Sequence, residues 1–474
     1  MNRKQFDVKR AREFTSICVL IGMITSIYCF MVESGNPEIP GYWLLPLSYA
    51  ICHFIFRKVF KYEFGMGLLI FEVIAIFRYI ITPIITCAVH NYDGHMWANP
   101  SMYFQSVVYI IIELVMAYFT MYMMIPYVKK NLRYCADDIK TGKLGIIKAL
   151  IIVYWVFIVT TSAQIRTMIF NFSLSSSSLV TSYNQTIFRN SIPSEYMMFY
   201  YIGLVVIYVE ILKIVKERKI SKGLKLVLIA IVSILYISCG WTDGNAVSRW
   251  GILIAVLTMI YVLMYFFPEK RKTIIIIGVC VVIAATLVGT MFKRISHGRD
   301  LSLWEAVMTY MTPEYMNEYF CGVHPVSNGI YVLRSVHENK FTTFLYDTVA
   351  NIPRLLSSLG IKGMSSATFF GTTINHVELI VPSTAMSYYV FGEFGTWIYT
   401  TICVYFMILA QTKIACASSL YKRLMLFQIV FWCALSMAVN IQIIQTNCWK
   451  YVIGLILIIM DERISIRLRS RRSQ

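Results

Sequence analysis

Arginines are the residues of this chain whose possible chemistry is clearest. A guanidinium group presents paired N–H donors in a fixed plane, which suits the oxygens of a phosphate. Several arginines stand at or near the outer end of an apolar run without an equal set of acidic residues beside them. They are Arg78, Arg166, Arg249, Arg294 and Arg299. This pattern predicts a site for a phosphorylated lipid head group; the alternative is that these arginines only anchor helices in the membrane interface.

Candidate acids and bases lie in one long polar segment, residues 293–385. His376, in the sequence Asn-His-Val-Glu-Leu, has Glu378 close by and is the best candidate for a general base. The alternative is a structural histidine. Glu314 lies four residues before Glu318, so the two share a helix face. Either Glu314 can substitute for His376 as the base, or this face is simply solvated.

Two more basic positions belong to the same segment. His297 lies between Arg294 and Arg299 in a compact basic cluster directly after an apolar run. Arg354 follows later in the segment. We include both positions among the candidate diphosphate- or substrate-binding residues. Leu301–Tyr310, Pro313–Phe320 and Phe341–Leu359 show helix-like spacing, so we expect short amphipathic helices lying on the outer membrane face and covering the bundle.

The elements that must position these residues are membrane-spanning helices. The 474-residue chain is 58% hydrophobic and 14% charged, with a mean hydropathy of +0.63; a soluble protein has about 25% charged residues. Continuous apolar runs predict an all-α polytopic protein and exclude a β-barrel. We expect twelve spans, at about 14–32, 42–60, 64–89, 101–125, 146–171, 195–215, 224–240, 248–267, 273–292, 386–410, 419–438 and 441–460.

The basic residues predict the orientation of these spans. With a cytoplasmic N terminus, the inner segments hold 30 of the 43 Lys and Arg residues, whereas the four short outer segments hold only Arg189. By the positive-inside rule, both termini are then cytoplasmic and residues 293–385 lie outside. The net charge of +18 therefore orients helices, and no nucleic-acid partner is expected. The predicted regions are residues 1–292 with nine spans, the external loop 293–385, and residues 386–474 with three spans and a basic cytoplasmic tail.

Charged residues also occur inside the predicted spans, where charge is costly and normally faces a partner or a cavity. Glu72 and Arg78 lie in the third span, Glu113 in the fourth and Lys450 in the twelfth. The two carboxylates either neutralise Arg78 between helices or take part in a functional site, and Lys450 is open to a packing role.

Several motifs do not occur. There is no Walker loop, GxGxxG, DxD pair for a metal-bound sugar nucleotide, HExxH or GxSxG, and the 12 cysteines form no CxxC pair. We therefore expect no metal and no cofactor. An enzyme facing outward without ATP or nucleotide sugars needs a substrate that carries its own leaving group, as a polyprenyl-diphosphate-linked sugar does.

The chain resembles the bacterial oligosaccharide repeat-unit polymerases (Wzy type) of O-antigen and capsule synthesis. The likeness rests on many spans with one large late external loop, on Gly244-Asn-Ala-Val-Ser-Arg-Trp, and on Val381-Pro-Ser-Thr followed by Val390-Phe-Gly-Glu-Phe-Gly. It covers the architecture of the whole chain but only a small share of its residues by motif. Asn375-His376 is also similar to the His motif of O-antigen ligases, although the order of the two residues is reversed.

This resemblance implies a GT-C-like, metal-independent, inverting glycosyltransferase at the outer face of the bacterial cytoplasmic membrane. Its donor would be a glycan on undecaprenyl diphosphate and its acceptor one lipid-linked repeat unit. A chain-length regulator and a flippase are the implied partners, together with the bilayer. The rival hypotheses are a flippase or transporter of lipid-linked oligosaccharides and a non-enzymatic assembly or receptor protein.

Overall fold

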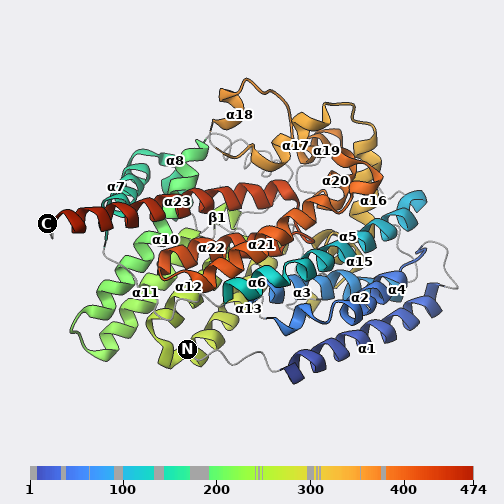
Figure 1. The fold of residues 1–474 in the computed structure, drawn as a ribbon, viewed down its shortest axis with the longest axis horizontal. Coiled ribbons are helices and arrows are strands. Elements are labelled where there is room, and N and C mark those ends of the chain that lie inside the picture. The colour runs from blue at the N-terminus through green and yellow to red at the C-terminus, as the bar shows by residue number, and fades with distance from the viewer. Residues whose placement is uncertain are drawn as a thin grey trace. The chain divides into compact units, whose positions relative to one another are not determined.

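The protein is a helical polytopic membrane protein (Figure 1). Its described elements also include one β-hairpin, whose two strands have two residues each. The computed structural model describes residues 8–33, 39–62, 65–89, 100–132, 144–170, 192–240, 242–243, 246–247, 249–295, 304–305, 308, 311–352, 354–374 and 380–472. Seven of the described helices are long and apolar enough to cross a bilayer. They lie at Ala11–Glu33, Met66–Val89, Pro100–Asn131, Glu195–Glu217, Lys222–Gly240, Glu393–Cys416 and Ile441–Ser465. Three shorter apolar helices occupy Leu44–Ile55, Ile146–Thr161 and Gly251–Phe266.

Contacts divide the chain into two compact units, each made of separate stretches of sequence. Unit 1 comprises residues 1–140, 309–418 and 429–449, and unit 2 comprises residues 141–308, 419–428 and 450–474. The boundary predicted from sequence at residue 385/386 falls inside the helix Ser383–Phe391 of unit 1.

Unit 1 combines N-terminal helices with the helices of the predicted external loop. Its helices are α1 (Val8–Glu33), α2 (Leu44–Ile55), η1 (Val59–Lys61), α3 (Met66–Ile76), η2 (Phe77–Ile81), α4 (Thr82–Val89), η3 (Pro100–Met102), α5 (Tyr103–Met123), α6 (Ile125–Leu132), α15 (Pro313–Tyr319), α16 (Val323–Arg334), α17 (Lys340–Val349), α18 (Leu355–Ser358), α19 (Ser366–Thr373), α20 (Ser383–Phe391), η5 (Glu393–Gly395) and α21 (Ile398–Cys416). The largest packing surfaces join α1 to α2, α5 to α21 and α16 to α20. The outward side chains of α1 include Leu20 and Ile24, as expected of a helix facing lipid.

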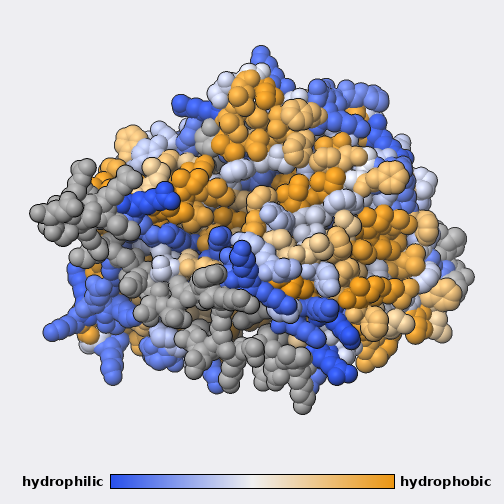
Figure 2. Space-filling model, in the orientation of Figure 1, coloured by the Kyte–Doolittle hydropathy of each residue, from blue (hydrophilic) through white to orange (hydrophobic). Residues whose placement is uncertain are grey.

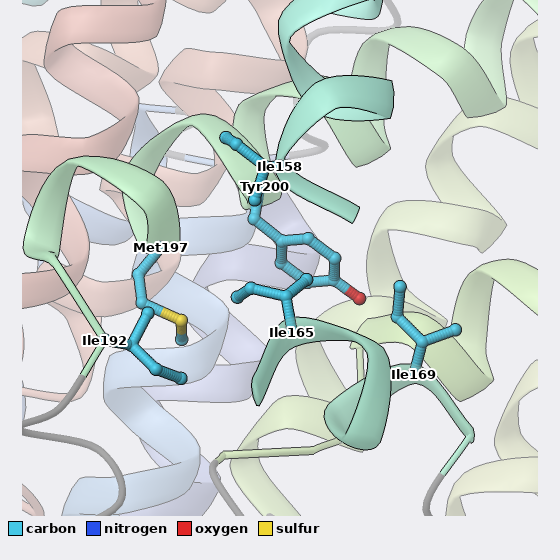
Figure 3. Close-up of a cluster of buried hydrophobic side chains, with 6 residues drawn as sticks. All are labelled: Ile158, Ile165, Ile169, Ile192, Met197 and Tyr200. Atoms are coloured by element: carbon cyan, nitrogen blue, oxygen red, sulfur yellow. The ribbon is translucent and has the colours of Figure 1, made fainter. Parts of the chain in front are cut away.

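In unit 2, helices that follow one another in sequence pack against one another. It contains α7 (Ile146–Thr161), α8 (Ala163–Phe170), α10 (Ser194–Glu217), α11 (Lys222–Gly240), β1 (Thr242–Asp243), β2 (Ala246–Val247), α12 (Arg249–Phe266), η4 (Pro268–Lys270) and α13 (Arg271–Ile295). Side chains of α7, α8 and α10 form one apolar cluster, in which Ile158, Ile165 and Tyr200 are fully buried (Figure 3). Two helices contribute to both units: α22 (Leu420–Ala434) and α23 (Ile441–Arg472).

Asp461 of α23 fixes the start of α7. Its carboxylate accepts a hydrogen bond of 2.8 Å from the backbone N–H of Ile147 and lies 3.5 Å from the ammonium of Lys148. A carboxylate at a helix N-terminus satisfies one of the unpaired N–H groups there and interacts favourably with the helix dipole. Gly145 is required at this point, because a Cβ there would lie 2.2 Å from the Asp461 oxygens.

Candidate functional site

Arg78 lies in the interior of unit 1, on a wide helical turn. The span Met66–Val89 is interrupted by the π-helical segment η2, which carries Arg78. Pro83, in the following turn, has no N–H to donate to Tyr79 and cannot continue a regular α-helix without a clash. The π turn accommodates this break, and such turns occur often at functional sites. The Arg78 side chain is only 1% exposed.

The partner of Arg78 is Glu113 of α5. Their closest atoms, Arg78 Nη1 and Glu113 Oε2, are 2.8 Å apart, and both side chains are buried. The hydroxyl of Thr384 donates to Glu113 Oε2 over 2.7 Å and accepts from Arg78 Nη2 over 3.4 Å. The hydroxyl of Thr400 donates to Glu113 Oε1. The structure thus supports the pairing interpretation for Arg78 and Glu113, while Arg78 Nε has no acceptor among the described residues.

Thr384 and Thr400 reach the same carboxylate because α20 and α21 form a helical hairpin. Gly392 has φ +78°, a conformation that glycine adopts without strain, and it turns the chain between the two helices. The backbone N–H of Tyr399 in α21 donates to Ser387 of α20 over 3.2 Å. The sequence run expected as one span at 386–410 is therefore two elements, α20 and the spanning segment that contains α21.

The backbone beside the start of α20 is non-helical and buried. Residues 435–440, between α22 and α23, form turns, and every side chain in this stretch is buried. The Ser383 hydroxyl donates to the carbonyl of Val439, and the Cys321 thiol donates to that of Ala438. Buried non-helical backbone needs partners for its polar groups, and these two carbonyls have them.

The second intramembrane carboxylate, Glu72, has its own set of partners. His53 Nε2 lies 3.1 Å from Glu72 Oε2, and the phenols of Tyr49 and Tyr118 donate to the carboxylate over 3.3 and 2.6 Å. His53 Nδ1 also faces an acceptor, the carbonyl of Tyr49 at 3.0 Å. A histidine that donates from both nitrogens carries a positive charge, so His53 neutralises Glu72. Lys450, the remaining charge, lies over the ring of Tyr201 within unit 2.

Another buried carboxylate, Asp347, was not singled out from the sequence. Asp347 of α17 is fully buried and accepts hydrogen bonds from the backbone N–H and the hydroxyl of Ser366 in α19, at 2.8 and 2.6 Å. The phenol of Tyr399 donates to it over 2.9 Å. Burial raises the pKa of Asp347 to about 7, although the three hydrogen bonds act in the opposite direction. This carboxyl ties two helices of the predicted loop to α21.

The other predicted site residues are distributed between the two units. Arg166 lies in α8 of unit 2, where it is exposed and donates to the carbonyl of Thr160. Arg249 begins α12, and both α8 and α12 contact β1. Arg354 of unit 1 is exposed, has φ +60° and precedes α18.

Glu314 lies in the first turn of α15 and is half-buried. The candidate base His376, its neighbour Glu378, and His297 and Arg299 lie outside the described residues, as do the side chains of Arg249 and Arg294. Their predicted roles remain predictions.

Sequence reasoning placed Glu113 at membrane depth but did not identify Thr384, Thr400 or Asp347. Thr384 belongs to Val381-Pro-Ser-Thr, the run that carries part of the family resemblance, so that motif held a signal. Thr400 and Asp347 carry no such signal, because each is identified only by contacts with distant segments of the chain. Comparison with known proteins adds no assignment, since no family model, no curated protein and no solved structure matches the chain.

Proposed function

We propose that this protein is a repeat-unit polymerase, in which a glycan on polyprenyl diphosphate is transferred to a lipid-linked repeat unit at the outer face of the cytoplasmic membrane. The proposal includes twelve spans and a GT-C-like arrangement. The observation that supports it best is the buried Arg78–Glu113 pair, which α20 and α21 complete with two hydroxyls. Helices α20 and α21, at the end of the predicted external loop and after it, thereby contribute to a charged site of the membrane bundle.

In the proposed mechanism, Arg166, Arg249, Arg294 and Arg299 hold the donor diphosphate, with His297 and Arg354 as further basic contacts. Fixed positive charge stabilises the leaving diphosphate as its bond to the sugar breaks. His376 removes the proton from the acceptor hydroxyl, with Glu378 or Glu314 as substitutes. Arg78, whose Nε keeps a free donor among the described residues, contributes to the site of the second lipid diphosphate.

The direct test uses purified protein in proteoliposomes with lipid-linked repeat units. Wild type should produce a ladder of longer lipid-linked glycans. Arg249→Ala should lower the rate by about 100-fold or more, the range for loss of one fixed electrostatic contact, whereas Arg249→Lys should retain part of the activity because it keeps the charge. Gel filtration must first show that both variants are folded. Full polymerising activity of Arg249→Ala would remove the diphosphate assignment.

One feature favours the second candidate, a flippase for lipid-linked oligosaccharides. The short helix α20 begins beside the non-helical residues 435–440, and interrupted helices line the binding sites of many transporters. The same proteoliposomes discriminate between the two functions. A flippase would make a labelled lipid-linked sugar accessible from the other face of the membrane without lengthening the glycan.

A further inference from the structure

Residues 340–364, which include α17 and α18, form a short arm on one flank of unit 1. The sequence predicts that such helices cover the outer ends of the spans. The described contacts of this arm are instead with the sides of two spans, one or two helical turns after the first residue of each. We call these residues, apart from residue 353, the α17–α18 arm.

The C-terminal end of α17 packs beside α23. The amide of Asn351 donates to the hydroxyl of Thr446 over 2.6 Å, and the indole N–H of Trp449 donates to the carbonyl of Thr348 over 2.9 Å. The spanning segment of α23 begins at Ile441. At a rise of 1.5 Å per residue, Thr446 and Trp449 lie about 8 and 12 Å below that start. With the membrane surface taken at the start of this candidate span, both contacts lie at the boundary between head groups and hydrocarbon.

The contacts of α17 with α21 give a similar distance independently. Tyr399 of α21 donates to Asp347, and its ring stacks on Phe344 with the centroids 6.2 Å apart. The spanning segment that contains α21 begins at Glu393, so Tyr399 lies about 9 Å along it. Counted from the starts of the two candidate spans, α17 therefore contacts both helices at a similar distance.

The exposed side chains of the arm include three large apolar ones. Phe341 is 68% exposed, Leu359 63% and Met364 46%. The stretch that carries Leu359 and Met364 lies on α17, because the Tyr346 phenol donates to the carbonyl of Ile361 and a Cβ on Gly363 would lie 2.5 Å from Thr342 Cγ2. Hydrophobic side chains accordingly cover the region of α18 near the top of Figure 2.

Two lysines flank this apolar surface. Lys340 begins α17 and Lys362 lies two residues before Met364, and both are exposed. Lysine side chains at an interface place their methylene stems along apolar surface and their ammonium groups among lipid phosphates. The arm thus presents apolar side chains to hydrocarbon and positive charge to head groups.

We propose that the α17–α18 arm is a lipid-binding surface. It inserts Phe341, Leu359 and Met364 into the bilayer leaflet in which α23 begins, and Lys340 and Lys362 contact the phosphates of that leaflet. The occupant is bilayer phospholipid, because the arm is held at the depth where lipid surrounds the neighbouring spans. The proposal does not depend on the chemistry proposed above.

The test places a photoreactive benzoylphenylalanine at position 341, 359 or 364 of the full-length protein in phosphatidylethanolamine–phosphatidylglycerol liposomes. After illumination, mass spectrometry measures covalent lipid adducts. The matched control carries the same group at His337, which is exposed in the turn before α17. We expect adducts at the three arm positions to exceed those at position 337 by about tenfold, as for side chains buried in the acyl region rather than in water.

Two outcomes would overturn the proposal. Equal, low lipid labelling at all four positions would show that the arm faces water. Cross-linked dimers in place of lipid adducts would show that a second copy of the chain covers the surface. Thermal stability of each labelled protein confirms folding, and neither outcome bears on whether the protein lengthens a glycan.

Discussion

Arg78 shows what a single charge requires inside a membrane protein. Its guanidinium group contacts Glu113 and Thr384. The hydroxyl of Thr400, from a fourth segment of the chain, donates a hydrogen bond to the Glu113 carboxylate. Burying one charge without its partner leaves a large desolvation penalty uncompensated, whereas an apolar pair of similar volume avoids that penalty. The pair can therefore be tested as a unit.

Arg78→Met alone should lower the free energy of unfolding by about 3–5 kcal/mol, because Glu113 is left buried and unpaired. The double variant Arg78→Met, Glu113→Leu should recover most of this loss. Thermal unfolding in detergent measures both effects, with the exposed Glu338→Gln as a control that should change little. If the stable double variant also polymerises at the wild-type rate, Arg78 serves the fold and not the substrate.

Asp347 should make stability depend on pH. Its pKa is raised from 3.8 to about 7 in the folded protein, chiefly by burial, so between these values the folded state binds the proton more tightly than the unfolded state. This stabilisation is fully present below pH 3.8 and is lost as the pH rises through about 7. Lowering the pH from about 8 to 5 should raise the melting temperature of wild type more than that of Asp347→Asn. Parallel pH profiles for the two proteins would contradict this assignment.

Among the elements, long helices were predictable, and their interruptions were predictable only in part. The expected spans at 195–215 and 224–240 correspond to α10 and α11, because each is a long apolar run bounded by charge. The break at Gly392 falls inside the single span expected at 386–410, whereas the turns at residues 435–440 fall at the expected boundary between the spans at 419–438 and 441–460. Tertiary packing decides these points.

The site was predictable only in part for the same reason. Charged residues at membrane depth were visible from the sequence, but their partners were not. Arg78 and Thr384 are 306 residues apart, and Glu72 takes His53 of a neighbouring helix rather than the arginine on its own span. Sequence spacing identifies neighbours on one helix, and it says nothing about contacts between helices.

The close contact of α16 and α20 should be sensitive to one added methyl group. A Cβ on Gly329 would lie 2.6 Å from the Cβ of Ala385 and 3.0 Å from Val381. Gly329→Ala should therefore destabilise the protein by about 1–3 kcal/mol, the usual cost of overpacking. The control is Gly223→Ala at the start of α11, where nothing lies within 4 Å. Equal melting temperatures for the two variants would show that α20 can shift freely.

At the scale of the whole molecule, orientation is the prediction with the widest consequences. The distribution of basic residues predicts that both termini are cytoplasmic and that residues 293–385 lie outside. A fluorescent protein fused after Gln474 should fold and emit, and alkaline phosphatase inserted after Gly298 should be active. The reverse result would place the candidate base and the basic cluster on the wrong side for a polymerase.

The separate partners of Glu72 and Arg78 have a consequence for how the chain is made. Glu72 can bind His53 and Tyr49 as soon as α3 leaves the ribosome, because α2 has already been synthesised. Arg78 has no Glu113 to pair with until α5 has been synthesised. We expect a nascent chain that ends before α5 to remain bound to the insertion machinery through its unneutralised arginine, and release into lipid to follow the synthesis of α5.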